Sequence, residues 1–324
     1  MLTLILFAAT LQPSVLQAPS PRLVGEAVSL ETPTGTLYGT IDVPSGYGPW
    51  PVVLLHPGSG PTDRDGNQAS LRNNSLKMLG RALAAQGIAV LRVDKRGVAA
   101  SRKALAKEED IRLDTYAADV TAWVEFLRKD PRFTKIGFAG HSEGGLIGLV
   151  AAKDAKFDAY ISLCGPGRPL AEILREQLKK APRANLPQTL LDSSLSILSE
   201  LEAGRTVKDV SPLLVSLFRP SVQPYLISAF RYDPATLVKG FTGPVLVING
   251  TTDIQVPPAD GERLTQAKPG SIHRVIPEMN HLFKRVPTTD RAIQLPVYGD
   301  PSVPLHPELV GEMVGFLKTA IGTK

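Results

Sequence analysis

Residues 136–152 read IGFAGHSEGGLIGLVAA, in which Gly140-His141-Ser142-Glu143-Gly144 separates a short apolar segment from an apolar helical one. The first segment predicts a buried strand and the second predicts a helix. A serine in this G-x-S-x-G pattern occupies a strained turn at the end of the strand, where a Cβ on either flanking glycine would collide with a neighbouring element. The pattern predicts an exposed, nucleophilic Ser142. The alternative is a tight glycine-rich turn that holds an unrelated serine.

The rest of the chain repeats this alternation of buried strands and helices. The apolar runs predicted to be strands are residues 52–55, 88–93, 136–139, 159–164, 245–248 and 272–276. Amphipathic helices are predicted between them, for example where Leu76, Leu79 and Leu83 share one face. This order predicts a parallel sheet with helices on both faces, an α/β fold. Two earlier alternating segments flank Thr32-Pro33-Thr34-Gly35 and predict an antiparallel hairpin at the N-terminal edge.

The strand rhythm is interrupted once, after Gly165-Pro166-Gly167. From Arg168 to Lys239 leucines recur at helical spacing, and no strand is predicted. We therefore expect an α/β core made of residues 21–167 and 241–324, with residues 168–240 inserted as a helical cap. The 324 residues on length alone suggest about two domains, and the insertion accounts for the excess over one.

The first 20 residues are almost uncharged, and their apolar run has the length of a signal-peptide core. The run lacks a preceding Lys or Arg, and Pro19 follows the best cleavage position, Ala18. We expect export to the periplasm or the medium. The alternatives are a cytoplasmic protein with a short N-terminal arm and a start codon placed too early.

Composition excludes several classes of function. The one cysteine, Cys164, rules out an intramolecular disulfide framework and a multi-cysteine zinc site, and it is expected to be a small core residue. A net charge of +5 with interleaved acidic and basic residues is typical of a solvated surface and gives no reason to expect a nucleic-acid partner. We expect no metal, no cofactor and no membrane-spanning segment, and the sequence leaves the oligomeric state open.

The turn of residues 140–144 lies between a predicted buried strand and a predicted helix, as a nucleophile elbow does. On this pattern the chain resembles serine hydrolases of the α/β-hydrolase superfamily. The resemblance implies the order serine, acid, histidine along the chain. Asp253 follows the strand 245–248 in Gly250-Thr251-Thr252-Asp253 and fits the acid, although such an aspartate can also simply cap a turn or helix. Of the five histidines, His281 alone lies in a loop after the last strand and before the last helix. It therefore fits the general base.

The loop after the first buried strand, residues 56–67, is the expected source of the second oxyanion donor. The backbone N–H of Glu143 would be the first donor, and Ser59 N–H the second, with Gly60 as the alternative. Gly58-x-Gly60 also resembles part of a dinucleotide fingerprint. Asp63 occupies the place of its third glycine and would repel a pyrophosphate, so that interpretation fails.

Three segments narrow the resemblance, namely residues 58–67, Asp94-Lys95-Arg96-Gly97 and residues 217–225. They are similar to a branch of bacterial lidded esterases and acyl hydrolases related to serine aminopeptidases. The similarity extends over nearly the whole chain from about Leu23. One departure is His56-Pro57, where many hydrolases have His-Gly, and this keeps Gly60 open as a donor.

Two further sets of residues are expected near the predicted site. Four charged residues, Asp63, Arg64, Asp65 and Arg96, are expected to brace the oxyanion loop with ion pairs rather than to contact a polar substrate. Four residues of the insertion are candidates for an apolar acyl pocket: Phe218, Tyr225, Leu226 and Phe230.

The sequence thus predicts a cofactor-free serine hydrolase that cleaves carboxylic esters through an acyl-enzyme. Thioesters and small peptide amides are the alternative substrates. A catalytically silent homologue that binds a ligand is a further alternative, but such a protein would be expected to lack one of Ser142, Asp253 and His281.

Overall fold

The computed structural model describes residues 25–181 and 186–322 of the chain. The predicted signal peptide or N-terminal arm, residues 1–20, lies outside the described residues, so export stays a prediction.

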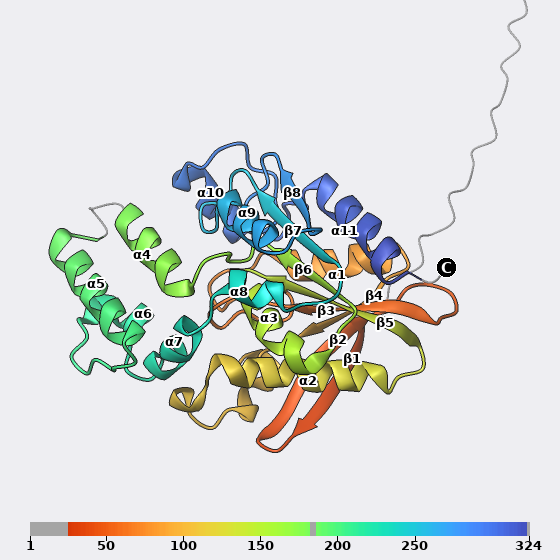
Figure 1. Ribbon diagram of the computed structural model, residues 1–324, viewed down its shortest axis with the longest axis horizontal. Helices are drawn as coiled ribbons and strands as arrows, with labels where there is room; N and C mark the ends of the chain where they lie inside the picture. Colours follow the sequence, from red (N-terminus) through yellow and green to blue (C-terminus); the bar gives the residue numbers. More distant parts are fainter. Residues whose placement is uncertain (1–24, 182–185, 323–324) are drawn as a thin grey trace, which may run out of the picture.

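Eight strands in the described part of the chain form one sheet, in the order β1-β2-β4-β3-β5-β6-β7-β8 (Figure 1). The strands are β1 (Gly25–Thr32), β2 (Gly35–Asp42), β3 (Trp50–His56), β4 (Ala89–Val93), β5 (Phe133–His141), β6 (Ala159–Leu163), β7 (Val245–Gly250) and β8 (Ile272–Ile276). β1 and β2 form an antiparallel hairpin, and β2 pairs antiparallel with β4. All the other pairs are parallel. The predicted sheet, mostly parallel with an N-terminal antiparallel hairpin, is confirmed.

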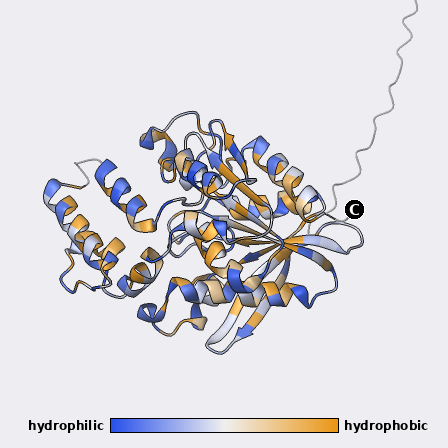
Figure 2. Ribbon diagram, in the orientation of Figure 1, coloured by the Kyte–Doolittle hydropathy of each residue, from blue (hydrophilic) through white to orange (hydrophobic). Residues whose placement is uncertain are grey.

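The central strands are apolar throughout because helices cover both faces of the sheet. Along β3, Val52 and Leu54 pack into the core on one face. Val53 and Leu55 pack into the core on the other. Successive side chains of a strand point to opposite faces, so a strand buried on both sides has no polar alternate positions. Figure 2 shows this apolar character along the middle of the sheet.

Helices of the α/β core form two layers on the sheet. Their bounds are α1 (Ser75–Ala84), α2 (Leu113–Arg128), α3 (Glu143–Ala155), α9 (Pro258–Ala267), α10 (Arg291–Tyr298) and α11 (Pro307–Ala320). Two 3-10 helices, η1 (Ala99–Ala104) and η2 (Glu108–Asp110), precede α2. α1 and α11 pack on the face of Val53, whereas α2 and α3 pack on the face of Val52.

The helical insertion between β6 and β7 is present. It comprises α4 (Leu170–Lys180), α5 (Gln188–Glu202), η3 (Pro212–Leu214), α6 (Val215–Phe218), α7 (Gln223–Phe230) and α8 (Pro234–Lys239). In Figure 1 its helices α4 to α7 lie to one side of the sheet, beyond the end of α3. Leu198 and Phe218 of the insertion belong to the same hydrophobic core as Val120 of α2. Arg168 anchors the start of the insertion by an ion pair with Asp260 of α9, at 2.7 Å.

One helix near the site was not predicted. α10 contains Pro296, which removes a backbone donor and normally indicates the end of a helix. Ile293 and Leu295 are half exposed, so the segment also lacks a clear buried face. Asp290 caps the helix by accepting a hydrogen bond from Ala292 N–H at 2.9 Å.

Across the described ranges, we find no helix that is both long enough and apolar enough to cross a bilayer.

Candidate active site

Ser142 occupies a strained turn between β5 and α3. Its dihedral angles, φ 54° and ψ −127°, lie outside the regions that residues with a Cβ ordinarily adopt. Its N–H donates to the Leu163 carbonyl of β6 at 2.8 Å, which fixes the turn to the sheet. A Cβ on Gly140 would lie 2.3 Å from the Gly144 carbonyl oxygen, and one on Gly144 would lie 2.7 Å from the His56 carbonyl oxygen. Only glycine fits at either position, as the sequence pattern predicted.

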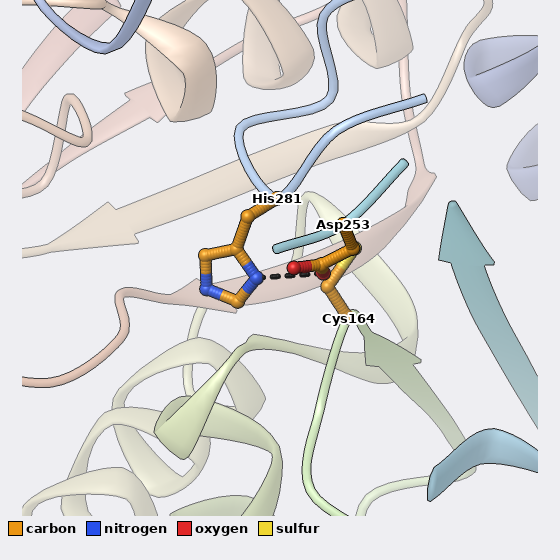
Figure 3. A group of neighbouring side chains, drawn as sticks. All are labelled: Cys164, Asp253 and His281. Atoms are coloured by element: carbon orange, nitrogen blue, oxygen red, sulfur yellow. Dashed lines mark hydrogen bonds and ion pairs between the residues drawn. The ribbon is translucent and has the colours of Figure 1, made fainter. Parts of the chain in front are cut away.

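Asp253 and His281 come together from the loops that follow the neighbouring strands β7 and β8. His281 Nδ1–H donates to Asp253 Oδ2 at 2.8 Å, and the two side chains are 3% and 0% exposed (Figure 3). Asp253 Oδ1 accepts from the backbone N–H groups of Gln255 and Val256, at 2.7 and 3.0 Å. Because the Nδ1 proton is held by the carboxylate, Nε2 is left as the acceptor of the imidazole.

Ser142 and His281 line one cavity of about 220 Å³, which we call the histidine-side cavity. In the described residues the hydrogen bonds of His281 do not include one to the Ser142 hydroxyl. Such contacts commonly tighten only when substrate is bound. His141, beside the serine, donates its Nε2–H to the His281 carbonyl oxygen at 2.9 Å. This bond joins the turn of Ser142 directly to the loop of His281.

Cys164 lies next to this pair, at the end of β6 (Figure 3). It is fully buried, and burial raises the pKa of its thiol well above the usual value, so the sulfur stays protonated. Its Sγ, a carboxylate oxygen of Asp253 and a ring nitrogen of His281 all lie within 4.8 Å of one another, which is the spacing of a candidate metal site. A metal ion would need the thiolate and would compete with the Asp253–His281 hydrogen bond. We therefore interpret the trio as an acid–base pair with a core thiol beside it.

The loop after β3 is held in place by the buried side chain of Lys95, which is 3% exposed. The Lys95 ammonium donates to the carbonyls of Gly58 and Gly60, the latter at 2.7 Å. In a trans peptide the C=O and N–H groups point in opposite directions, so holding the Gly58 carbonyl also orients the Ser59 N–H away from Lys95. The Thr62 hydroxyl donates to the Ser59 carbonyl at 2.8 Å and orients the Gly60 N–H in the same way.

Both candidate oxyanion donors of this loop border the space around Ser142. Ser59 and Gly60 line a cavity with Ser142 and Glu143, and Ser59 also lines the histidine-side cavity. Glu143 is the first residue of α3, where backbone N–H groups have no acceptor within the helix. The arrangement can therefore present N–H groups from two sides to an oxygen near Ser142.

The cavity that contains Glu143 extends under the insertion and measures about 320 Å³; we call it the insertion-side cavity. Its apolar walls include Ile173, Leu174, Leu217, Tyr225, Leu226 and Phe230. Of the four predicted pocket residues, Phe218 is the exception. Its side chain is 0% exposed and packs in the hydrophobic core, because helical spacing distinguishes buried from exposed faces but not a core from a cavity.

Two opposite charges are buried at the junction of the loop and the elbow. Burial lowers the pKa of Lys95 to about 8, and the nearby Glu143 carboxylate opposes this shift. Burial raises the pKa of Glu143, which the charge of Lys95 opposes. Each ion is thus disfavoured by desolvation and favoured by the other.

Comparison with known proteins places the chain in a family. The family model described as serine aminopeptidase, S33, matches residues 73–284, a range that contains Ser142, Asp253 and His281. The chain belongs to the S33 serine aminopeptidase family. Esterase EstD of Thermotoga maritima is 30% identical over 252 residues, which are 76% of this chain and 58% of EstD. The match therefore spans little more than half the length of that relative.

Solved structures confirm the α/β-hydrolase fold. Est1E from Butyrivibrio proteoclasticus, determined with ferulic acid bound, is similar with a TM-score of 0.60 and 19% identity, covering 91% of this chain and 100% of Est1E. Proline iminopeptidase from Mycobacterium smegmatis has a TM-score of 0.59 and 15% identity, covering 91% and 98% of the two chains. Because the sequence identities are below 20%, these similarities are evidence for a shared fold and not for a shared activity.

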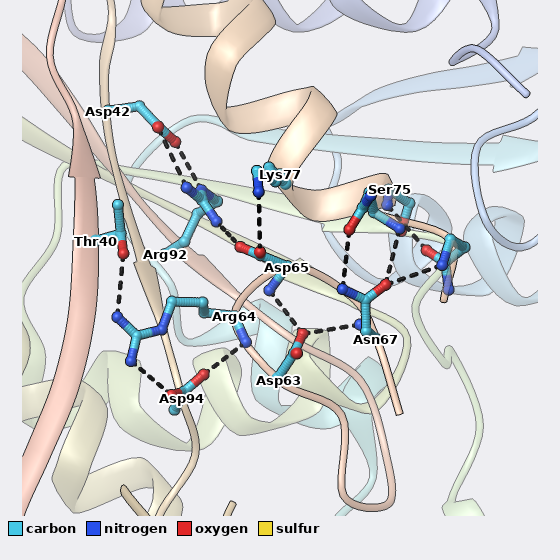
Figure 4. Close-up of polar contacts among 12 residues, drawn as sticks. Thr40, Asp42, Asp63, Arg64, Asp65, Asn67, Ser75, Lys77, Arg92 and Asp94 are labelled. Carbon is cyan, nitrogen blue, oxygen red and sulfur yellow. Dashed lines mark hydrogen bonds and ion pairs between the residues drawn. The ribbon is translucent and has the colours of Figure 1, made fainter. Parts of the chain in front are cut away.

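In this S33 family member, a network of charges holds the loop after β3, residues 56–67, which is the predicted oxyanion loop (Figure 4). Arg64 pairs with Asp94 at 2.6 Å, and Asp65 pairs with Arg92. Asp63 Oδ1 accepts backbone hydrogen bonds within the loop. Asp63, for which we find no ion pair among the described residues, holds the loop by these backbone hydrogen bonds instead. The predicted ion-paired brace is confirmed for Arg64 and Asp65. It is wrong for Arg96, whose Nε donates to Asp119 of α2 at 3.0 Å.

The sequence analysis did not predict the roles of Arg92 and Lys95, two buried cations that contact the loop after β3. Arg92 lies within β4 and is 3% exposed, with its Nε donating to Asp42 of β2 at 2.6 Å. The sequence did contain a signal for Arg92, because an arginine inside an apolar strand must be buried with a charged or polar partner. Lys95 had no comparable signal, since a lysine after a strand is ordinarily exposed. Tyr298 of α10, which lines the histidine-side cavity, was missed with its helix.

Proposed function

We propose that the protein is a serine hydrolase that cleaves carboxylic esters by way of an acyl-enzyme. The observation that carries this proposal is the buried hydrogen bond between Asp253 Oδ2 and Nδ1 of His281, which lines one cavity together with the strained Ser142. A buried carboxylate that fixes one imidazole nitrogen leaves the other to act as a base, which is the arrangement that activates a serine hydroxyl.

The reaction would begin when His281 Nε2 accepts the proton of the Ser142 hydroxyl as its oxygen attacks the ester carbonyl. The negative oxygen of the tetrahedral intermediate would be stabilised by the N–H groups of Glu143 and Ser59, with Gly60 as the alternative to Ser59. His281 then returns the proton to the departing alcohol oxygen, and the C–O bond breaks. Water, activated in turn by His281, hydrolyses the acyl-enzyme and releases the acid.

The insertion would act as a cap that selects the acyl group. Its residues supply most of the apolar wall of the insertion-side cavity, which opens onto Ser142. Similarity to esterase EstD favours ester substrates. Thioesters and small amides can be cleaved by the same chemistry, so the relative rates on matched ester, thioester and amide substrates decide among them.

The proposal is tested with a fluorophosphonate probe and a series of p-nitrophenyl esters. We expect the probe to label Ser142 and the esters to be hydrolysed, with Ser142→Ala abolishing labelling and lowering kcat by about 10⁶ if the three residues act as a unit. Ser193→Ala, an exposed serine on α5, is the matched control and should leave both unchanged. Absence of labelling in folded protein, or labelling that persists in Ser142→Ala, contradicts the proposal.

A further inference from the structure

Ser142 lies where two separate cavities meet. The insertion-side cavity and the histidine-side cavity share Ser59, Ser142 and Gln255 in their walls. Glu143 lines only the first of the two, and His281 lines only the second. A molecule that spans both cavities would therefore have its reacting bond at Ser142.

The position of His281 distinguishes the two ends of such a molecule. On the proposed function, which this inference requires, His281 must pass a proton to the oxygen of the departing alcohol. A general acid has to lie within hydrogen-bond reach of the group that it protonates. The alcohol portion of the ester therefore occupies the histidine-side cavity, and the acyl portion occupies the insertion-side cavity.

The walls of the two cavities differ in chemistry. The insertion contributes mainly aliphatic and aromatic side chains to the first cavity. The histidine-side cavity is lined by the polar Thr62, Gln68, Asn73 and Tyr298, by the shared Gln255, and by Leu71 and Leu282. No Asp, Glu, Lys or Arg is among the described residues that line it. Burial lowers the pKa of His141 to about 3, so this imidazole is also uncharged at neutral pH.

Two of the polar groups are already oriented by the protein. Thr62 donates its hydroxyl hydrogen to the Ser59 carbonyl, so it can only accept from Gln68, whose Nε2 lies 2.9 Å away. This leaves the Gln68 amide oxygen without a protein donor among the described residues. Gln255 Nε2 donates to the Tyr298 hydroxyl at 3.2 Å, and the Tyr298 proton remains available to a ligand.

We infer that the histidine-side cavity is a leaving-group subsite for a neutral alcohol that carries additional hydroxyl groups, of the size of a polyol or monosaccharide. A hydroxyl both donates and accepts, so it can donate to the Gln68 amide oxygen and accept from Tyr298. An alkyl alcohol would leave these groups desolvated and unpaired, which lowers its affinity. A phosphate-bearing leaving group would meet no cationic side chain in this cavity.

The test compares two butanoate esters that form the same acyl-enzyme. Methyl 6-O-butanoyl-glucopyranoside carries ring hydroxyls, and cyclohexylmethyl butanoate has a similar ring without them. We expect kcat/KM for the sugar ester to exceed that of the cyclohexylmethyl ester by about tenfold or more, because a site built for hydrogen bonds rejects the analogue that lacks them. Deacylation is common to both, so the difference reports on the leaving group.

Variants of the cavity identify which groups supply the preference. Gln68→Leu and Tyr298→Phe should each reduce the ratio of the two kcat/KM values by about fivefold, the usual effect of one neutral hydrogen bond. Leu226→Ala, in the insertion-side cavity, is the matched control: it should change both esters together and leave the ratio as it was.

Equal kcat/KM for the two esters, or a ratio that neither cavity variant changes, overturns the inference. Hydrolysis of p-nitrophenyl butanoate but of neither test ester also overturns it, because the serine then accepts the butanoyl group and the leaving-group class is wrong. Absence of both hydrolysis and labelling counts against the proposed function itself.

Discussion

Three loops meet at the site, those of Asp253 and His281 and the loop after β3, and the protein holds them by two kinds of interaction. The loop of Asp253 is fixed by backbone N–H groups, and the adjoining His281 loop by the neutral imidazole of His141. The oxyanion loop is fixed by buried ions, with Lys95 under its carbonyls and ion pairs at its far end. Neutral contacts and paired ions fail differently. Losing a neutral contact removes one hydrogen bond, whereas losing one ion of a buried pair leaves the other unpaired.

The difference also separates chemistry from positioning. In the proposed mechanism Asp253 acts directly on the imidazole that moves the proton, whereas Lys95 acts by orienting a backbone segment. Removing the first should therefore cost more activity than removing the second, even though the second is a charged group buried beneath the loop. The three predictions below test this ranking, and their expected effects decrease in size.

Replacing Asp253 with Asn should have the largest effect. The amide can keep the space filled, but it no longer holds the proton on Nδ1 or stabilises the imidazolium, and the equivalent change in a well-studied serine protease lowers kcat by about 10⁴. Steady-state kinetics on a p-nitrophenyl ester measures it. Asp119→Asn is the matched control, because Asp119 is also buried and ion-paired but contacts Arg96 far from the imidazole. A comparable loss in both variants would show that the effect arises from folding rather than from proton transfer.

Replacing Lys95 with Met should have the intermediate effect. The Gly58 and Gly60 carbonyls lose their donor, the loop relaxes, and the oxyanion N–H groups move from their places. Loss of one such donor typically lowers kcat by about 10² to 10³, and we expect about 10² with little change in KM. Kinetics and the rate of fluorophosphonate labelling should fall together, because both reactions place a negative oxygen in the same position.

The control for Lys95 is Lys77→Met. Lys77 belongs to the same charged network, since its ammonium lies 3.6 Å from Asp65, but its side chain is partly exposed. The one hydrogen bond from Lys77 to a loop carbonyl, that of Asp65, comes from its backbone N–H, which the substitution keeps. Its loss should change kcat by less than about twofold, as is usual for an exposed pair. If Lys77→Met and Lys95→Met lower kcat equally, general electrostatics rather than positioning of the loop explains both results.

The sequence predicted what depends on short-range pattern. Gly140, Ser142 and Gly144 lie within five residues, and the steric reason for the glycines is local. Asp253 and His281 were predicted from the order serine, acid, histidine that the resemblance to α/β hydrolases implies, together with their places after two predicted strands. Their hydrogen bond agrees with that order, although catalysis by them stays a proposal.

What the sequence did not predict depends on contacts between distant segments. Lys95 reaches a loop 35 residues earlier in the chain, and no periodicity records that contact. Tyr298 belongs to a helix that contains a proline and has no clear apolar face, so neither the helix nor its place in the cavity could be anticipated. Phe218 shows the same limit, since an apolar side chain at helical spacing fits a core and a cavity equally well.

The neutral imidazole of His141, which holds the loop of His281, should make the free energy of unfolding depend on pH. Burial lowers the pKa of His141 to about 3, against 6.5 in an unfolded chain. Between these values the unfolded chain binds a proton that the folded protein does not, so stability is present above pH 6.5 and is lost as pH falls toward 3. The contribution is about 1.4 kcal/mol per pH unit inside this window. In His141→Gln, whose amide can still donate to the His281 carbonyl, that contribution is absent.

Urea denaturation at pH 6.5, 5.5 and 4.5 measures the contribution of His141 to the free energy of unfolding, the smallest of the expected effects. The wild-type free energy of unfolding should fall more steeply than that of His141→Gln, so the gap between the two proteins narrows by about 1.4 kcal/mol for each pH unit. Leu163→Ala is the control, because a buried apolar truncation lowers stability by an amount that does not depend on pH. Parallel pH curves for wild type and His141→Gln would mean that the pKa of His141 is the same in the folded and the unfolded chain, so that its imidazole becomes a cation as pH falls below 6.5. Below that pH the loop of His281 would be held by an ion, and the contrast with the loop after β3 would disappear.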